Sequence, residues 1–110
     1  MSELKVNTIS VHELKKRYDL NNNLCLIDVR EDHEWKEAHI AWAKHIPKDK
    51  IADGIKTLVP AHDCPIYLHC RGGVRSLDAA AKLIALGYKE VYSVDGGIND
   101  WANAGYPIVV

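Results

Sequence analysis

The residues best suited to carry out chemistry lie in one short segment, residues 70–76. In order, the segment reads Cys70, Arg71, Gly72, Gly73, Val74, Arg75 and Ser76. The paired glycines allow the backbone to curl tightly, so that several amide N–H groups can converge on one atom. The two arginines add permanent positive charges. Such a loop favours an anion at its centre, and the thiolate of Cys70 is the group placed to be that anion.

The elements predicted on either side of this segment strengthen that hypothesis. Residues 65–69 are apolar with a proline at the first position, which is typical of a strand, and residues 76–86 have a helical pattern that ends at Gly87. A helix N-terminus supplies unpaired amides and a partial positive charge. We therefore expect the pKa of Cys70 to lie below the free value of about 8.5, and Cys70 to be a nucleophile that needs no separate base. The alternative is that Cys70 is a small buried core residue and that the glycines only form a turn.

The rest of the chain alternates short apolar runs with helical patterns. Strands are predicted over residues 6–9, 24–29, 43–46, 65–69 and 91–94, and helices over residues 10–18, 31–37, 49–59, 76–86 and 98–104. Ser10 and Glu13 match the pattern of a capping box at the start of the first helix. This alternation predicts an α/β fold, with a mostly parallel sheet and helices on both faces. Ligands of such sheets bind beyond the carboxyl ends of the strands, where the loop of residues 70–76 begins.

Composition limits the classes of function. The 110 residues, 47% of them apolar, are enough for one domain with its own core, and we expect a single domain over residues 1–110. The formal net charge of −1 gives no reason to expect binding to nucleic acid or to a membrane surface. The chain has neither a run of about 18 apolar residues nor an apolar signal segment. We expect a soluble cytoplasmic protein whose size suits a monomer.

The remaining cysteines and the histidines do not form a recognisable site. Three cysteines are an odd number for a disulfide framework, and no metal-binding spacing such as Cys-x2-Cys is present, so we expect neither a metal nor a cofactor. Cys25 lies inside a predicted strand and is expected to be an inert core thiol. Cys64 begins the strand that Cys70 follows, which places the two about 20 Å apart at roughly 3.3 Å per residue.

Three stretches together resemble the rhodanese-like sulfurtransferases. Residues 70–76 are similar to the active-site loop of that family, and residues 26–31 with Glu34, Trp35, His39 and Ile40 are similar to its early signature. Residues 85–94 with Gly96, Gly97, Trp101, Gly105 and Pro107 are similar to its C-terminal signature. The chain departs from the pattern at residues 41–43, where Ala-Trp-Ala replaces Pro-Gly-Ala, outside the cysteine loop.

The resemblance implies a fold and a reaction. The fold would be a rhodanese-like three-layer sandwich around a five-stranded sheet. Cys70 would carry a sulfane sulfur as a persulfide, taken from a small anionic donor such as thiosulfate and passed to a thiol or cyanide. The amides of residues 71–76 would hold the persulfide, and Arg71 and Arg75 would attract the donor. Asp28 and Arg30 would lie near the loop as a supporting ion pair, and Trp35 would wall the pocket or serve as an ordinary core or surface residue.

Two other functions remain open from the sequence. A cysteine phosphatase or arsenate reductase of this fold uses a Cys-x5-Arg loop, whereas Cys70 and Arg75 are separated by four residues, and Ser76 stands where the arginine is required. A non-enzymatic persulfide carrier or regulatory module docked to a partner is the second alternative. Inactive modules of this family usually lack the cysteine that this chain retains.

Overall fold

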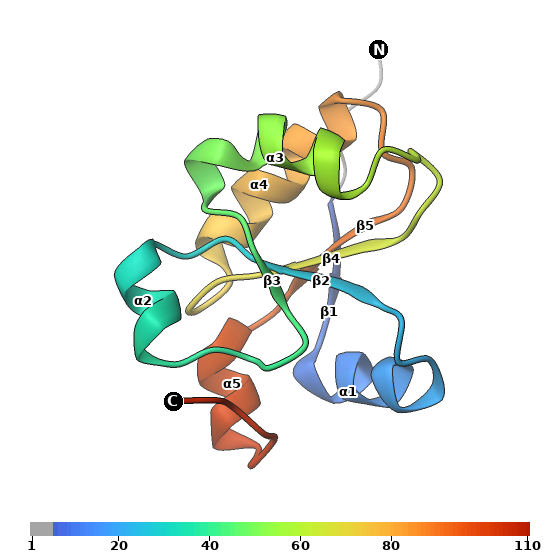
Figure 1. Ribbon diagram of the computed structural model, residues 1–110. Coiled ribbons are helices and arrows are strands. Elements are labelled where there is room, and N and C mark those ends of the chain that lie inside the picture. The colour runs from blue at the N-terminus through green and yellow to red at the C-terminus, as the bar shows by residue number, and fades with distance from the viewer. Residues whose placement is uncertain (1–5) are drawn as a thin grey trace.

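The computed structural model describes residues 6–110 and has one parallel sheet at its centre (Figure 1). The strands are β1 (Asn7–Ile9), β2 (Cys25–Asp28), β3 (Lys44–His45), β4 (Ile66–His69) and β5 (Val91–Val94). They lie in the order β1-β5-β4-β2-β3, and every pairing is parallel. The expectation of a mostly parallel five-stranded sheet is confirmed.

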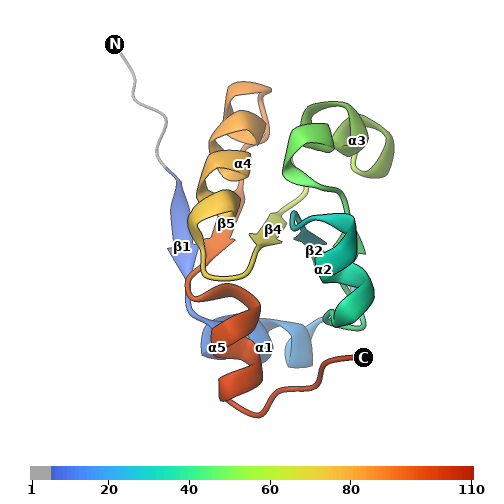
Figure 2. The ribbon, with the colours of Figure 1, turned by 90° about the vertical axis from the view of Figure 1, so that its left-hand side faces the viewer.

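Helices cover both faces of the sheet, as Figures 1 and 2 show. One face carries α3 (Ile51–Leu58) and α4 (Val74–Ala85), and the other carries α1 (Val11–Leu20) and α5 (Gly97–Asn103). The short helix α2 (Asp32–Glu37) follows β2 and lies near the carboxyl ends of the strands, and a 3-10 turn, η1 (Lys48–Lys50), leads into α3. The predicted three-layer sandwich is therefore the observed architecture.

Two hydrophobic cores fill the spaces between the layers. The core beneath α3 and α4 includes Ile51, Ile55 and Leu83, and the core beneath α1 and α5 includes Leu14 and Trp101. All four residues of β4 are buried, because helices cover both sides of this central strand. The strand that leads to Cys70 is therefore held rigidly from both faces.

Several element boundaries differ from the prediction. Helix α4 begins at Val74 instead of residue 76, because Gly73 adopts a left-handed conformation (φ 109°) that starts the helix earlier. Helix α1 continues to Leu20, two residues past its predicted end. Cys25 lies in β2, as predicted, but it is the first residue of that strand and is half-buried instead of fully enclosed in the core.

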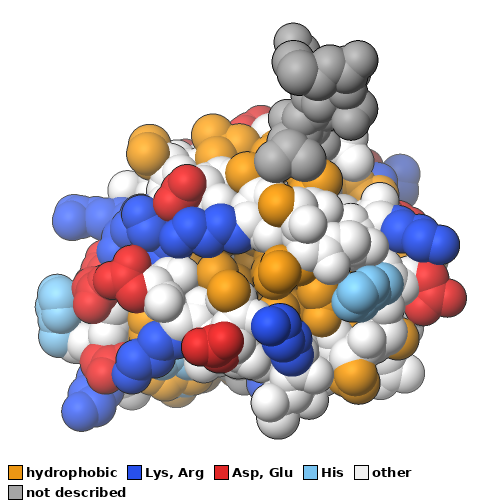
Figure 3. Space-filling model, turned by 90° about the horizontal axis from the view of Figure 1, so that it is seen from above, with side chains coloured by type: hydrophobic (Ala, Val, Ile, Leu, Met, Phe, Trp, Pro, Cys, Tyr) orange, Lys and Arg blue, Asp and Glu red, His pale blue; other side chains and the backbone are white. Residues whose placement is uncertain are grey.

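The surface over α3 and α4 carries mixed charges. Figure 3 shows lysine, arginine and acidic side chains interspersed around hydrophobic ones, with no large area of one sign on this face. Within residues 6–110, no helix has the length and apolar character needed to cross a membrane. The expectation that no signal segment is present concerns mainly residues 1–5, which lie outside the described part of the chain.

Candidate active site

The sheet topology places the cysteine loop where the strand order reverses. Strands β2 and β4 are neighbours with Asp28 opposite His69, while β3 lies beyond β2 and β5 lies beyond β4. Cys70 follows the last residue of β4 directly. A crevice forms at such a switch point because the connections leave toward opposite sides.

The Cys70 sulfur lies inside a cradle of hydrogen-bond donors. The backbone N–H of Gly73 donates to Sγ at 3.1 Å, and Ser76 Oγ lies 3.6 Å from Sγ. Burial alone would raise the pKa of this thiol. The Ser76 hydroxyl and the amides of Ser76, Gly73 and Gly72 outweigh burial, so that the pKa of Cys70 lies below its ordinary value. The cradle therefore favours the thiolate, as the sequence predicts.

A second serine, which the sequence analysis did not single out, fixes the first. Ser93 on β5 is fully buried, and its Oγ lies 2.7 Å from Ser76 Oγ. Ser76 also contacts the carbonyl oxygen of Gly73 at 3.2 Å. When Ser93 donates to Ser76, the single proton of Ser76 is left for Gly73 or for the thiolate. In the sequence, this role was indicated only by the presence of a serine within the otherwise apolar strand of residues 91–94.

Replacing Ser76 by alanine should move the pH profile of Cys70 alkylation by iodoacetamide to higher pH. The substitution removes the hydroxyl but leaves the amides, so the thiolate loses one of its stabilising donors. The measurement is the alkylation rate of Cys70 by mass spectrometry across pH 5–10. Ser10→Ala, which removes the cap of α1, is the control and should lower stability without moving the profile. An unchanged midpoint of the alkylation pH profile in Ser76→Ala would show that the Ser76 hydroxyl does not stabilise the Cys70 thiolate.

The two loop arginines are in different situations, which the sequence did not reveal. Arg75 binds Glu34 of α2 through Nη1 and Nη2, at 2.6 and 3.0 Å, and this pairing lowers the pKa of Glu34 to about 2. Arg71 is exposed and forms no ion pair within residues 6–110. Glu34 offsets the charge of Arg75, so the prediction that the loop arginines attract an anion now depends mainly on Arg71.

Asp28 and Arg30 form the ion pair that the resemblance implies. Asp28 is fully buried and accepts hydrogen bonds from Arg30 Nε and Nη2 at 3.0 and 2.8 Å. Arg30 Nη2 also donates to the carbonyl oxygen of Ala38 at 2.6 Å, which ties β2 to the end of α2. The pair holds α2, and with it Glu34, beside the loop.

His69 is a buried neighbour of this pair that the sequence analysis missed. It is fully buried, its Nε2 lies 3.6 Å from Asp28 Oδ2, and its Nδ1 lies 3.3 Å from the carbonyl oxygen of Cys70. Burial lowers the pKa of His69, so the ring is neutral at pH 7. In the sequence, the only indication that His69 belongs to the site was its position as a polar residue at the end of an apolar strand.

Trp35 is not among the residues that line the cavity described below. Its ring stacks between the rings of His39 and His45, with centroid distances of 3.7 and 4.9 Å. Trp35 therefore joins α2 to β3, and its expected place in the pocket wall is not observed.

Helix α5 contacts the loop through its first turn. The amides of Ile98 and Asn99 donate to the carbonyl oxygens of Cys70 and Arg71 at 2.9 and 3.2 Å. Gly97 permits this approach, because a Cβ atom there would lie 2.2 Å from the Cys70 oxygen and φ is +51°. Gly96 and Gly97 thus form the expected turn between strand and helix.

Gly97→Ala should lower the free energy of unfolding by about 3 kcal/mol, since it combines a positive φ with a clash against the loop backbone. Gly105→Ala is the matched control. Gly105 also has a positive φ (84°) but open space around it, so the loss there should be about 1 kcal/mol. Urea unfolding followed by circular dichroism measures both. Equal losses of unfolding free energy in the two variants would mean that the close contact of Gly97 with the loop contributes nothing to stability.

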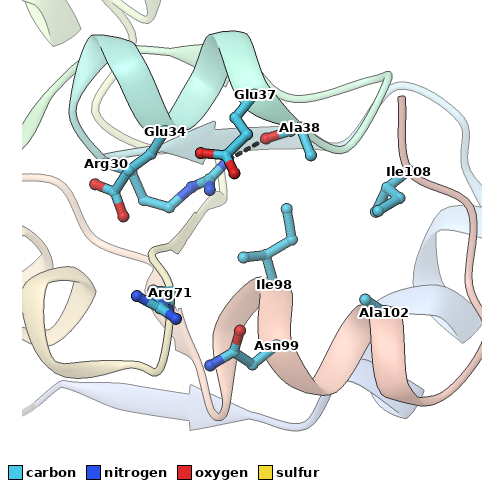
Figure 4. A pocket seen from close by; sticks show the side chains of 9 residues that line it. All are labelled: Arg30, Glu34, Glu37, Ala38, Arg71, Ile98, Asn99, Ala102 and Ile108. Atoms are coloured by element: carbon cyan, nitrogen blue, oxygen red, sulfur yellow. Dashed lines mark hydrogen bonds between the residues drawn. The ribbon is translucent and has the colours of Figure 1, made fainter. Parts of the chain in front are cut away.

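A cavity of about 280 Å³ adjoins the loop between α2 and α5 (Figure 4). Its lining residues are Arg30, Glu34, Glu37, Ala38, Arg71, Ile98, Asn99, Ala102 and Ile108. The C-terminal segment closes one side, held by an antiparallel bridge between His39 and Val109. The cavity lies beside the residue that follows Cys70, so a small molecule can bind next to the loop.

The other two cysteines lie away from this site. Cys25 and Cys64 both line a second cavity at the amino ends of β2 and β4. Burial, followed by the proximity of Cys64, raises the pKa of Cys25 to about 11, which keeps that thiol protonated. Among residues 6–110, no group of three or more His, Cys, Asp or Glu side chains lies close enough to hold a metal ion.

The rhodanese-like domain family matches residues 10–104, which include the cysteine loop, the Asp28–Arg30 pair and helices α2 and α5, but not the C-terminal residues Ile108 and Val109. The chain belongs to this family. This rhodanese-like domain is 37% identical over 106 residues to "Probable adenylyltransferase/sulfurtransferase MoeZ" of Mycobacterium tuberculosis. The alignment covers 96% of this chain and 27% of that protein. The chain thus spans about a quarter of the length of this relative.

A relative of similar length and a solved structure agree with the family. The thiosulfate sulfurtransferase GlpE of Pseudomonas putida is 34% identical over 108 residues, covering 97% of this chain and 92% of that protein. The crystal structure of a thiosulfate sulfurtransferase from Pseudomonas aeruginosa superimposes with a TM-score of 0.84 at 31% identity. That superposition covers 94% of this chain and 20% of the other. The fold inferred from the sequence is that of these relatives.

Proposed function

We propose that this rhodanese-like domain is a sulfurtransferase that moves a sulfane sulfur from thiosulfate or a persulfide donor to a thiophilic acceptor, through a persulfide on Cys70. The single observation that carries the proposal is the Cys70 sulfur held between the Gly73 amide and the Ser76 hydroxyl. The same donors that lower the pKa of the thiol can hold the negative terminal sulfur of a persulfide. The relatives named as sulfurtransferases support the same class of reaction.

The first half-reaction forms the persulfide. The Cys70 thiolate attacks the outer sulfur of thiosulfate, a new S–S bond forms to Sγ, and the S–S bond of thiosulfate breaks. Sulfite leaves as a dianion with the electron pair of that bond, and the outer sulfur keeps its negative charge as the terminal sulfur of the persulfide. In the second half-reaction, cyanide or a thiol takes the terminal sulfur and restores the Cys70 thiolate.

The arrangement of the loop arginines favours this reaction over phosphate-ester hydrolysis. A phosphatase loop must aim an arginine at the equatorial oxygens of a phosphate. Here Arg75 directs two of its N–H donors to Glu34. The loop amides remain free to hold a single sulfur atom.

The test is intact-mass spectrometry of the protein after incubation with thiosulfate. We expect a gain of one sulfur atom, assigned to Cys70 by peptide mapping and lost on addition of cyanide. No gain of sulfur with thiosulfate or with a small persulfide would contradict the proposal. If Cys70 gains the sulfur but does not release it to cyanide or thiols, the result would favour a persulfide carrier instead of an enzyme.

A further inference from the structure

The cavity beside the loop has one positive and one negative side chain without partners. Four charged residues line it, but Arg30 is bound to Asp28, and Glu34 is bound to Arg75. Arg71 and Glu37 form no ion pair and no side-chain hydrogen bond within residues 6–110, and both are exposed. Figure 4 shows them on opposite sides, Arg71 from the cysteine loop and Glu37 from α2. Two opposite charges are therefore available to a ligand.

The space between these charges is small and partly apolar. Ile98, Ala102 and Ile108 form its apolar side, and Asn99 adds an amide beside Arg71. A volume of about 280 Å³ lies just under the lower end, about 300 Å³, of the range for drug-sized ligands. The cavity is therefore large enough for a small molecule that has charged groups and a short aliphatic part.

We propose that this cavity binds the sulfur acceptor, and that the acceptor is a small α-amino-acid thiol such as cysteine. The carboxylate of the amino acid pairs with Arg71, its ammonium group pairs with Glu37, and its methylene group contacts Ile98. A ligand with only negative charges meets the carboxylate of Glu37 as well as Arg71, so a zwitterion complements the cavity better than an anion does. This proposal rests on the proposed function, because it names the acceptor of that reaction.

The transfer step balances without any further reactant. The sulfur of the amino-acid thiol attacks the outer sulfur of the Cys70 persulfide and forms a new S–S bond. The bond between that outer sulfur and Sγ breaks, and its electron pair returns to Sγ, where the Gly73 amide and Ser76 stabilise the thiolate. The thiol proton remains with the product, which leaves as an amino-acid persulfide.

The experiment follows discharge of the preloaded persulfide in a single turnover, after removal of the donor. Cysteine is compared with cysteamine, which lacks the carboxylate, and with 3-mercaptopropionate, which lacks the amine. Arg71→Gln should slow discharge to cysteine and 3-mercaptopropionate by about two- to fivefold, the range of exposed ion pairs, and leave cysteamine unchanged. Glu37→Gln should slow cysteine and cysteamine by a similar factor and leave 3-mercaptopropionate unchanged.

This crossed pattern cancels differences in intrinsic thiol reactivity, because each thiol is compared only with itself across the variants. Asp53→Asn, which neutralises an exposed carboxylate on α3 outside the cavity, is the matched control and should change none of the three rates. If Arg71→Gln slows all three thiols equally, Arg71 acts on the Cys70 thiolate and the proposal is overturned. Equal rates in all variants overturn it as well.

Failure of this proposal differs from failure of the proposed function. A protein that loads sulfur from thiosulfate and discharges it to cyanide, but shows no crossed pattern, retains the sulfurtransferase function and loses only the amino-acid acceptor. A protein that never loads sulfur contradicts the function itself.

Discussion

Cys70→Ser is expected to reduce sulfur transfer from thiosulfate to cyanide by about three orders of magnitude or more. The cradle around Sγ stabilises a thiolate, whereas a serine hydroxyl stays protonated at neutral pH and cannot form a persulfide. Serine is close to cysteine in size, and the side chain already lies among hydrogen-bond donors, so the fold should be retained. The measurements are the steady-state transfer rate and the urea unfolding midpoint of both proteins.

Cys64→Ser provides the matched control for that substitution. Cys64 is half-buried and precedes β4, at the opposite end of the strand from Cys70. Its replacement should leave the transfer rate within about twofold, the size of a minor packing effect. Transfer by Cys70→Ser at the wild-type rate would mean that another thiol carries the sulfur.

Asp28→Asn is expected to lower the free energy of unfolding by about 3–5 kcal/mol, the usual cost of removing one partner from a buried ion pair. Asp28 is fully buried and Arg30 is only 6% exposed, so the guanidinium cannot turn to water when its counter-ion is lost. The substitution should also make α2 more mobile, because Arg30 donates a hydrogen bond to the carbonyl oxygen of Ala38 at the C-terminal end of that helix. Urea unfolding at pH 7 measures the first effect, and hydrogen exchange of the α2 amides measures the second.

Asp19→Asn is the control for the buried pair. Asp19 pairs with Lys15 on the surface of α1 with 56% of its side chain exposed, so the same chemical change there should cost under about 1 kcal/mol. Similar losses in the two variants would mean that burial of Asp28 adds nothing to the strength of its ion pair.

Local patterns were sufficient to predict the fold and the position of the cysteine loop. The apolar runs of β2, β4 and β5 marked the central strands, and the cysteine, glycines and following helix marked the loop, because these features depend on residues close in the chain. The start of α4 was predicted two residues too late. Whether Val74 belongs to the helix depends on the left-handed conformation of Gly73, which precedes it. Propensity alone could not decide that conformation.

The contacts that give the site its charge could not be predicted in this way. Arg75 and Glu34 are 41 positions apart and meet only because β2 and β4 are neighbours. Ser93 reaches Ser76 for the same reason, from the next strand of the sheet. A sequence shows which side chains are present, but the pairing of distant strands decides which of them neutralise each other.

The strand order also has a consequence for how the molecule folds. Within residues 6–110, strand β1 pairs with β5 alone, so the backbone of Asn7 can pair within the sheet only once the segment that contains Tyr92 is present. Parallel pairings between distant segments form slowly, because a long loop must close before any contact offsets its entropy. The segment through β5 must therefore have left the ribosome before β1 can dock, and until then the edge of β1 is open to other chains. This domain should depend on rapid synthesis of the segment from β1 to β5, or on a chaperone, more than a helical bundle of the same length.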